Sequence, residues 1–264
     1  MRDIAPVLVN FQGIEAVPAR LLRARGNDTA RALATAEWVL RRKADGRYLA
    51  VVAHARISAL LPGALQREWR RTTPGEVLRR LSDAQAPGDD ATLPLAPLRD
   101  MLAGLGIDAG YGIARGLAAV SEPARLAFAG FDRYARPLWL GSKAADAWQR
   151  MRAAAACEGV GLEAISGYRS HAYQLGIFRR KLARGLALEA ILEVNAAPGY
   201  SEHHSGHALD IGAPGEPPAE ESFETTPAFA WLRARAADFG FSMSYPRDNP
   251  HGIVYEPWHW CWQR

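Results

Sequence analysis

Hydrophobic residues recur at helical spacing in four stretches of the second half of the chain. The clearest stretch is 144–157, which carries an apolar stripe and is followed by Gly159 and Gly161. Such spacing lets one face of a helix be buried, and a glycine after the last turn is a common helix end. The pattern predicts this helix and three others, over 173–184, 188–194 and 228–239.

Short runs rich in branched and aromatic residues predict strands between these helices. In the first half, the runs 36–42 and 47–53 flank Asp45-Gly46, a dipeptide typical of tight hairpin turns. Further strands are predicted over 7–11, 162–166, 210–212, 241–245 and 253–262. The chain therefore mixes helices and strands in both halves, with no internal repeat.

Composition places the chain among ordinary globular proteins. It has 264 residues, of which 48% are hydrophobic and 23% charged, enough for one large domain or two modest ones. The formal charge is +4, but the basic residues are spread along the chain, so nucleic acid is not an expected partner. No run of 18 apolar residues exists, so we expect no membrane span. The two cysteines, Cys157 and Cys261, are interpreted as free buried thiols.

The candidate chemistry begins with the motif at residues 198–212. Three of the seven histidines lie within 203–207, and Asp210 follows. Neutral imidazole and carboxylate are zinc ligands, and Gly206 lets the backbone fold back between them. Another histidine, His259, lies near the C-terminal end. We interpret His203, Asp210 and His259 as three ligands of a zinc ion whose fourth position is left for water.

A rival ligand pair is His203 with His207, which are four residues apart, as on one face of a helix. Pro198, Gly199 and Gly206 disfavour a helix there, and the chain contains no His-Glu-x-x-His string. His204 and His207 are therefore expected to support the site or to be exposed.

Two charged residues complete the candidate site. Glu256 lies three residues before His259, and Pro257 biases it away from helix, so a loop could place its carboxylate beside metal-bound water as a general base. Arg169 follows a Ser-Gly-Tyr turn. A guanidinium there could bind a substrate carboxylate or stabilise the oxyanion of a tetrahedral intermediate.

Three sequence segments, taken in order, resemble a known family. They are Ser166-Gly167-Tyr168-Arg169-Ser170, then Ser201-x-His203-x-x-Gly206-x-Ala208-x-Asp210, then Glu256-x-x-His259-Trp260. Together they resemble the VanY-type D-alanyl-D-alanine carboxypeptidases, part of the wider group of lysostaphin-like, D-Ala-D-Ala and hedgehog-fold zinc proteins. The resemblance covers roughly residues 130 to 262.

The resemblance implies a fold and a set of roles. The fold is α+β, with a small antiparallel sheet that carries the zinc site, flanking helices and an N-terminal accessory domain. We therefore expect an accessory domain of unknown role over 1–125 and a catalytic domain over 126–264. By analogy with the family, His203, Asp210 and His259 hold Zn²⁺ and Glu256 is the catalytic base. The same analogy has the substrate contacted by Arg169, Gln174, Ser201 and Tyr245.

The implied activity is removal of the C-terminal D-amino acid from peptidoglycan stem peptides or muropeptides. Alternatives are an L,D-carboxypeptidase, a peptidoglycan endopeptidase, or a non-catalytic zinc-fold binding protein. The last class would typically lack the base or a ligand, and all four residues are present here. The first residues, 1–6, do not resemble a secretory signal, so we expect a cytoplasmic location, with a periplasmic one as the alternative suggested by the substrate. The sequence does not indicate an oligomeric state.

Overall fold

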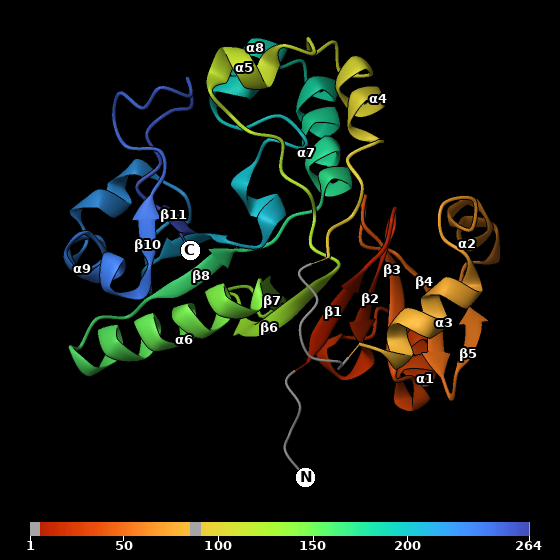
Figure 1. Ribbon diagram of the computed structural model, residues 1–264. Coiled ribbons are helices and arrows are strands. Elements are labelled where there is room, and N and C mark those ends of the chain that lie inside the picture. The colour runs from red at the N-terminus through yellow and green to blue at the C-terminus, as the bar shows by residue number, and fades with distance from the viewer. Residues whose placement is uncertain (1–5, 85–90, 264) are drawn as a thin grey trace. The chain divides into compact units, whose positions relative to one another are not determined.

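The computed structural model describes residues 6–84 and 91–263, so most of the N-terminal segment tested above for a secretory signal lies outside it. The chain forms two compact units (Figure 1). The first comprises the residues up to Leu93 together with Pro123–Phe128. The second comprises Pro94–Glu122 and Ala129–Arg264.

The first unit is built on an antiparallel sheet with strand order β5-β4-β3-β2-β1-β6. The predicted hairpin is confirmed, because β3 and β4 pair across a turn in which Gly46 adopts a φ of 69°. Strand β6 begins in this unit and ends in the second. The elements are β1 (Val7–Asn10), β2 (Ile14–Pro18), η1 (Ala19–Leu21), α1 (Asn27–Thr35), β3 (Trp38–Arg42), β4 (Tyr48–Ala53), β5 (Arg56–Ala59), α2 (Pro62–Glu68), α3 (Pro74–Ser82) and β6 (Arg125–Phe131).

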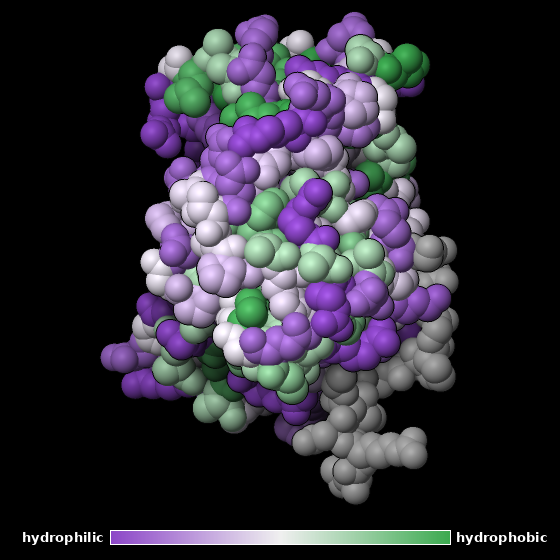
Figure 2. Space-filling model, turned by 90° about the vertical axis from the view of Figure 1, so that its left-hand side faces the viewer, coloured by the Kyte–Doolittle hydropathy of each residue, from purple (hydrophilic) through white to green (hydrophobic). Residues whose placement is uncertain are grey.

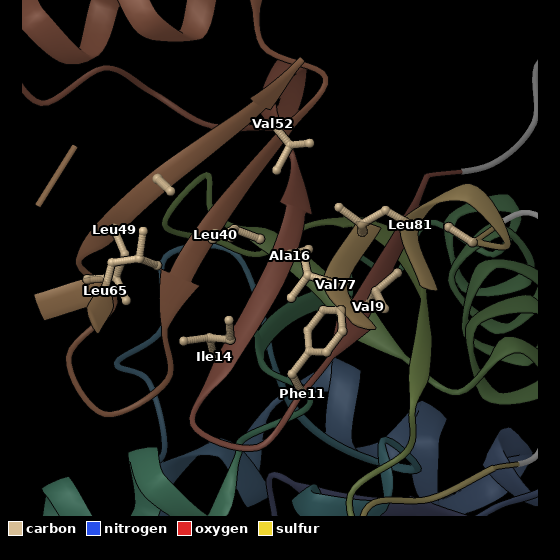
Figure 3. Close-up of a cluster of buried hydrophobic side chains, with 12 residues drawn as sticks. Val9, Phe11, Ile14, Ala16, Leu40, Leu49, Val52, Leu65, Val77 and Leu81 are labelled. Carbon is tan, nitrogen blue, oxygen red and sulfur yellow. The ribbon is translucent and has the colours of Figure 1, made fainter. Parts of the chain in front are cut away.

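Both faces of this sheet are covered. On one face, side chains of β1 to β4 pack against α2 and α3, where Leu65, Val77 and Leu81 complete the cluster (Figure 3). On the other face, Val39 and Val51 pack beside partly buried residues of α1. Strand β2 was missed by the strand patterns, because all five of its residues are buried and Glu15 shares a face with Val17, so apolar and polar positions do not alternate regularly.

Strand β5 was also missed, for a different reason. It is joined to β4 by the two residues His54 and Ala55, whose φ angles are 49° and 57°. Two left-handed residues form the turn that suits a tight hairpin, but this turn usually contains Asn or Gly. The sequence His-Ala therefore gave no turn signal.

The second unit contains a four-stranded antiparallel sheet in the order β10-β11-β9-β8. This mixture of helices and antiparallel sheet confirms the predicted α+β class. Its elements are α4 (Leu98–Ala103), α5 (Tyr111–Arg115), β7 (Pro137–Leu140), α6 (Ser142–Cys157), β8 (Glu163–Ser166), α7 (His171–Ala183), α8 (Leu188–Glu193), η2 (Glu202–Ser205), β9 (Ala208–Gly212), η3 (Glu221–Thr225), α9 (Pro227–Arg235), η4 (Ala236–Phe239), β10 (Phe241–Met243) and β11 (His259–Trp262).

Helix α6 shows how the apolar stripe determines packing. Its buried residues, including Trp148 and Met151, recur every three or four positions and contact η4 and β7. Full burial of a large apolar side chain contributes roughly 1.5–3 kcal/mol. The helix ends before Gly159, which has a φ of 76° and so provides the left-handed residue predicted there.

The segment 94–122 belongs to the second unit, although the sequence pattern suggested a single boundary at 125/126. Its helices α4 and α5 share a core with α7 and α8, in which Leu98, Leu102 and Tyr111 pack with Phe178 and Ile191. Tertiary packing of short helices, which have weak sequence signals, decides this assignment.

The remaining expectations concern the last strand, the two cysteines and the absence of a membrane span. The last strand starts at His259 and not at 253, because Pro257 and Trp258 form a turn before it. Cys261 is buried as expected, but Cys157 is exposed; both are free thiols. Within 6–84 and 91–263, the helices are all too short or too polar to cross a membrane. Hydrophilic residues cover much of the face in Figure 2, with apolar residues between them in small groups.

Candidate active site

The register of the four-stranded sheet brings together two predicted metal ligands. In the antiparallel pair of β9 and β11, Asp210 lies directly opposite His259. Residues in that relation project from the same face of a sheet, about 5 Å apart. Asp210 Oδ1 lies 3.1 Å from His259 Nδ1. The pairing joins residues 49 positions apart in the sequence.

The third ligand approaches from the short helix η2, which immediately precedes β9. His203 is 1% exposed, and its Nε2 lies 3.2 Å from the same Oδ1 of Asp210. Gly206 ends η2 with a φ of 73°, so the chain reverses and enters β9 as predicted. One donor atom each from His203, Asp210 and His259 thus lie within 4.8 Å of one another, close enough to hold a metal ion.

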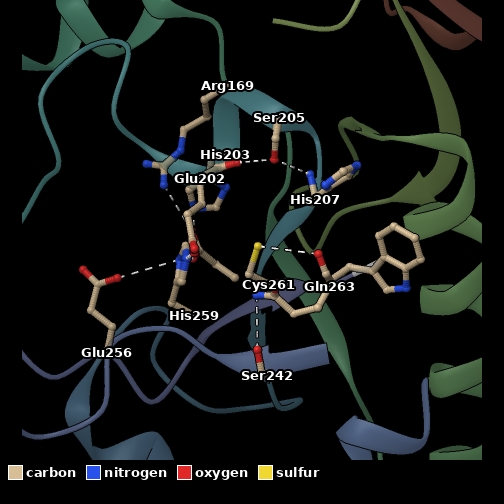
Figure 4. A network of polar contacts seen from close by, with 12 residues as sticks. Arg169, Glu202, His203, Ser205, His207, Ser242, Glu256, His259, Cys261 and Gln263 are labelled. Carbon is tan, nitrogen blue, oxygen red and sulfur yellow. Dashed lines mark hydrogen bonds and ion pairs between the residues drawn. The ribbon is translucent and has the colours of Figure 1, made fainter. Parts of the chain in front are cut away.

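Each histidine is oriented through its other ring nitrogen. His203 Nδ1 donates to the carbonyl of Gly167 at 2.7 Å, which leaves Nε2 as the ligand atom. His259 Nε2 donates to Glu202 Oε2 at 2.8 Å, which leaves Nδ1 toward Asp210 (Figure 4). Fixing the second nitrogen in this way is typical of metal-binding histidines.

Electrostatics at these three residues suit a divalent cation. Burial lowers the pKa of His203 to about 4, and the positive charge of Arg169 adds to this effect, so the imidazole is neutral. Burial would raise the pKa of Asp210, but His203, His259 and Arg169 hold it well below its usual value. Burial opposes a charge on His259, yet hydrogen bonds to Asp210 and Glu202 raise its pKa to about 10. The carboxylates that favour a proton there would equally favour a metal ion.

Glu256 lies beside this cluster without belonging to it. Its Oε2 is 3.8 Å from His259 Nδ1 (Figure 4). Its backbone N–H donates to Tyr245 O, which keeps it in a loop just before β11. Burial raises the pKa of Glu256 to about 7, helped by the charges of Asp210 and Glu202 and opposed by those of His259 and Arg169. A carboxylate with that pKa can accept and return a proton near neutrality.

All eight residues predicted as metal ligands, general base or substrate contacts line one pocket of about 310 Å³. Arg169 Nη2 lies 3.7 Å from Asp210 Oδ2, while its Nε makes no hydrogen bond to any residue the structure describes. The pocket is lined by Arg169, Gln174, Ser201, His203, Asp210, Tyr245, Glu256 and His259, with Val194, Asn195, Ala196, Ala219, Ile253, Val254 and Trp258.

The hydrogen bonds of Gln174 determine what its side chain can offer a substrate. An amide side chain has both donor N–H groups and an acceptor oxygen. In the structure, Gln174 Nε2 donates to Ala196 O at 2.9 Å, and Oε1 has no partner among the described residues. Gln174 therefore offers an acceptor, which suits a substrate N–H group.

The neighbouring histidines have different roles. His204 is fully buried, so it is not exposed; its Nδ1 donates to Arg169 O at 2.6 Å. His207 packs edge-on against Trp262 and is not a member of the metal-capable group, so the rival pair does not form.

Sequence reasoning missed Glu202, although a carboxylate next to a ligand histidine was an available signal. It also missed Glu122, which lies 46 residues before Tyr168 in the sequence but accepts a hydrogen bond from its hydroxyl.

Two histidines and one carboxylate, held by an antiparallel sheet and the short helix before it, make a candidate site for one metal ion. Comparison with known proteins identifies the family of the chain. The family model "VanY: D-alanyl-D-alanine carboxypeptidase" matches residues 137–264. The chain is 30% identical over 144 residues to the bifunctional D-Ala-D-Ala dipeptidase and D-Ala-D-Ala carboxypeptidase VanXYC of Enterococcus gallinarum, covering 52% of this chain and 73% of that protein. The chain therefore belongs to the VanY-type peptidase family, as the three motifs predicted.

Two other relatives are similar over shorter parts. The putative carboxypeptidase YodJ of Bacillus subtilis is 36% identical over 133 residues, which is 49% of this chain. Among solved structures, the LD-carboxypeptidase LdcB is 35% identical over 47% of this chain and 59% of that chain, with a TM-score of 0.44. The chain spans 48% of the length of YodJ and 27% of that of the Enterococcus faecium D-alanyl-D-alanine carboxypeptidase.

Proposed function

We propose that the second unit is a zinc-dependent carboxypeptidase that removes the C-terminal D-amino acid from peptidoglycan stem peptides of the D-Ala-D-Ala type. The observation that carries the proposal is the convergence of His203, Asp210 and His259 on one pocket with Glu256 and Arg169. The names of the relatives, which include D-alanyl-D-alanine carboxypeptidases, support the substrate class.

The donor set fits zinc. Two neutral imidazole nitrogens and one carboxylate oxygen are a common set of protein ligands for a catalytic zinc ion. His203 Nε2, Asp210 Oδ1 and His259 Nδ1 would hold it, and Gly167 and Glu202 would keep the two rings oriented. When bound, zinc supplies Lewis-acid polarisation and a water of lowered pKa.

The protein's own groups would then do the following. Glu256 would take a proton from the attacking water and return it to the leaving amine, the two roles of a general acid–base group. Arg169 would bind the C-terminal carboxylate of the peptide, because it lines the pocket and its Nε makes no hydrogen bond to the described residues. Gln174 Oε1 and Ser201 would contact the peptide backbone, and Tyr245, whose ring lies 4.8 Å from that of His259, would limit the depth of the pocket.

A direct test is to incubate the zinc-loaded protein with purified stem peptides and measure the product masses. A pentapeptide ending in D-Ala-D-Ala should lose one alanine. The Glu256→Gln variant, which is nearly isosteric, is the control for contaminating activity. Loss of D-Ala from a tetrapeptide alone would indicate an L,D-carboxypeptidase, and cleavage of cross-linked dimers alone an endopeptidase. No cleavage of any of them would favour a binding protein.

The cellular location also stays a prediction. Fractionation of cells that make the protein would test the expected cytoplasmic location, and an exported, shortened form would contradict it.

A further inference from the structure

Glu122 is a buried carboxylate that lies outside the three motifs and outside the pocket lining. It is 6% exposed and ends the segment 94–122, outside the residues matched by the family model. Its Oε2 accepts from the Tyr168 hydroxyl at 2.5 Å, and its Oε1 accepts from the backbone N–H of His171 at 2.9 Å. Glu122 thus binds residues on both sides of Arg169.

The second of these bonds lies at a helix terminus. His171 is the first residue of α7, and Ser170 is its N-cap, with Oγ accepting from Tyr173 N at 3.1 Å. The first N–H groups of a helix have no partners within it, and the helix dipole favours a negative charge there. The Glu122 carboxylate satisfies one of these groups and fixes where α7 begins.

The backbone of Arg169 is held by the metal motif. Its N–H donates to His203 O at 3.2 Å, and its carbonyl accepts from His204 Nδ1 at 2.6 Å. His204 Nε2 in turn accepts from Gly199 N at 3.1 Å. Because Nε2 accepts a hydrogen bond, Nδ1 is the donor, and the His204 ring links Gly199 to Arg169.

A second contact joins the two sets of bonds. The ring of His171 packs edge-on against that of His204, with centroids 4.4 Å apart, and His171 Nε2 donates to Val120 O at 2.7 Å. The turn 168–171 is therefore fixed on one side by residues 120–122 and on the other by residues 203–204. The Arg169 side chain of this turn is directed to the metal cluster, with Nη2 3.7 Å from Asp210 Oδ2 (Figure 4).

We infer that Glu122 is a positioning residue that sets the place of the Arg169 guanidinium in the pocket, by holding Tyr168 and His171. Glu122 does not line the pocket, so it acts through Arg169 and not on the substrate. The inference rests on the proposed function, in which Arg169 binds the carboxylate of the peptide. The segment 94–122 lies outside the residues matched by the family model. The inference gives this segment a role in positioning Arg169.

The test compares acid and C-terminal amide forms of one stem peptide. If Glu122 positions Arg169, then two variants should reduce the preference for the acid: Tyr168→Phe, which removes the donor hydroxyl, and Glu122→Gln, which removes the negative charge and turns one acceptor oxygen into an amide donor. A small displacement of a binding group costs rate steeply, so we expect the kcat/KM ratio of acid to amide to fall by about threefold or more. Glu122→Ala should bring the ratio close to that of Arg169→Ala.

A matched control is available in the same unit. Glu158 also accepts two hydrogen bonds, from Trp231 Nε1 at 2.9 Å and Arg235 Nη1 at 2.7 Å, and does not line the pocket. Glu158→Gln should leave the acid-to-amide ratio unchanged. A purely structural role for Glu122 would lower the folded fraction and so reduce both rates equally, leaving the ratio as in wild type; that result would overturn the inference.

A second measurement does not depend on activity. Amide hydrogen exchange in Glu122→Ala should be faster by about tenfold across residues 167–173, because that turn loses its anchor, while 208–212 and 259–262 keep their protection. Unchanged exchange across 167–173 would overturn the inference whatever the peptides show. If wild type cleaves neither peptide, or cleaves both equally, the proposed function fails and hydrogen exchange alone decides the role of Glu122.

Discussion

The two units bury polar side chains for different purposes. In the first unit, the buried Glu15 forms an ion pair with Arg41 on the adjacent strand at 2.6 Å, and the pair serves the sheet. In the second unit, buried histidines and carboxylates converge on one pocket, where Arg169 Nε and Gln174 Oε1 have no hydrogen-bond partner among the described residues. Of the residues the structure describes, only His203, Asp210 and His259 form a group able to hold a metal ion. Buried polar groups indicate function where they converge and remain partly unpaired.

The largest expected effect is loss of the metal. His203→Ala, Asp210→Ala and His259→Ala should each lose most bound zinc after dialysis, because each removes one of three ligand atoms. Metal analysis of the purified variants measures this. His207→Ala is the control from the same motif and should keep its zinc, since His207 lies outside the group. Full zinc in all three ligand variants would refute the assignment.

Glu256→Gln should keep zinc and fold but lose turnover. Glutamine is nearly isosteric with glutamate but cannot take a proton from water, and general-base catalysis is typically worth about 10² to 10⁴ in rate. Steady-state kcat, together with metal content and a thermal melt, checks this. A purified variant with a rate near that of wild type would show that Glu256 is not the base.

Arg169→Ala should narrow the preference for a free carboxylate. We expect wild type to cleave the acid form of a stem peptide at least about tenfold better than its amide, equivalent to about 1.4 kcal/mol. The variant should lose most of that preference, because hydrogen bonds to charged groups contribute about 1.5–3 kcal/mol. If Arg169 instead stabilises the oxyanion, Arg169→Ala should reduce the kcat/KM of the acid and the amide forms by the same factor. Equal cleavage by wild type would favour an endopeptidase.

A smaller effect is expected at Arg115, which braces one wall of the pocket. Its guanidinium donates to the carbonyls of Leu192, His251 and Gly252 at 3.4, 3.2 and 2.6 Å, and so joins the segments that lead to Val194 and Val254. Arg115→Met should raise KM by roughly three- to tenfold with zinc content unchanged, since each lost bond to a charged group is worth about 1.5–3 kcal/mol before relaxation. Arg115→Lys should recover part of the loss. An unchanged KM would show that the wall holds without this residue.

The smallest effect on activity is expected in the first unit. Glu15→Gln should reduce the free energy of unfolding of that unit by about 1–2 kcal/mol, because Arg41 loses a buried charged partner. Turnover by the second unit should be unchanged. Denaturant unfolding measures the change in the free energy of unfolding, and an activity assay on the same variant measures turnover. A fall in kcat without unfolding would mean that the first unit contributes to the reaction.

The sequence by itself determined what could be read locally. The helix 142–157, the hairpin at Asp45-Gly46 and the reversal at Gly206 follow from side-chain spacing and from glycine's freedom to adopt positive φ. The order and residue types of the three motifs sufficed to predict the family, and the resemblance implied or supported eight residues that line the pocket.

Tertiary structure decided what depends on partners distant in the chain. Asp210 meets His259 only through the register of β9 with β11, and residues 94–122 join the second unit only through the core around Phe178. The Gln174 amide donates to Ala196 O, 22 residues away. Glu122 accepts hydrogen bonds from Tyr168 and His171, which lie 46 and 49 residues away. Spacing along the chain carries no information about such pairs, because packing and hydrogen bonding select them only after the strands and helices have met.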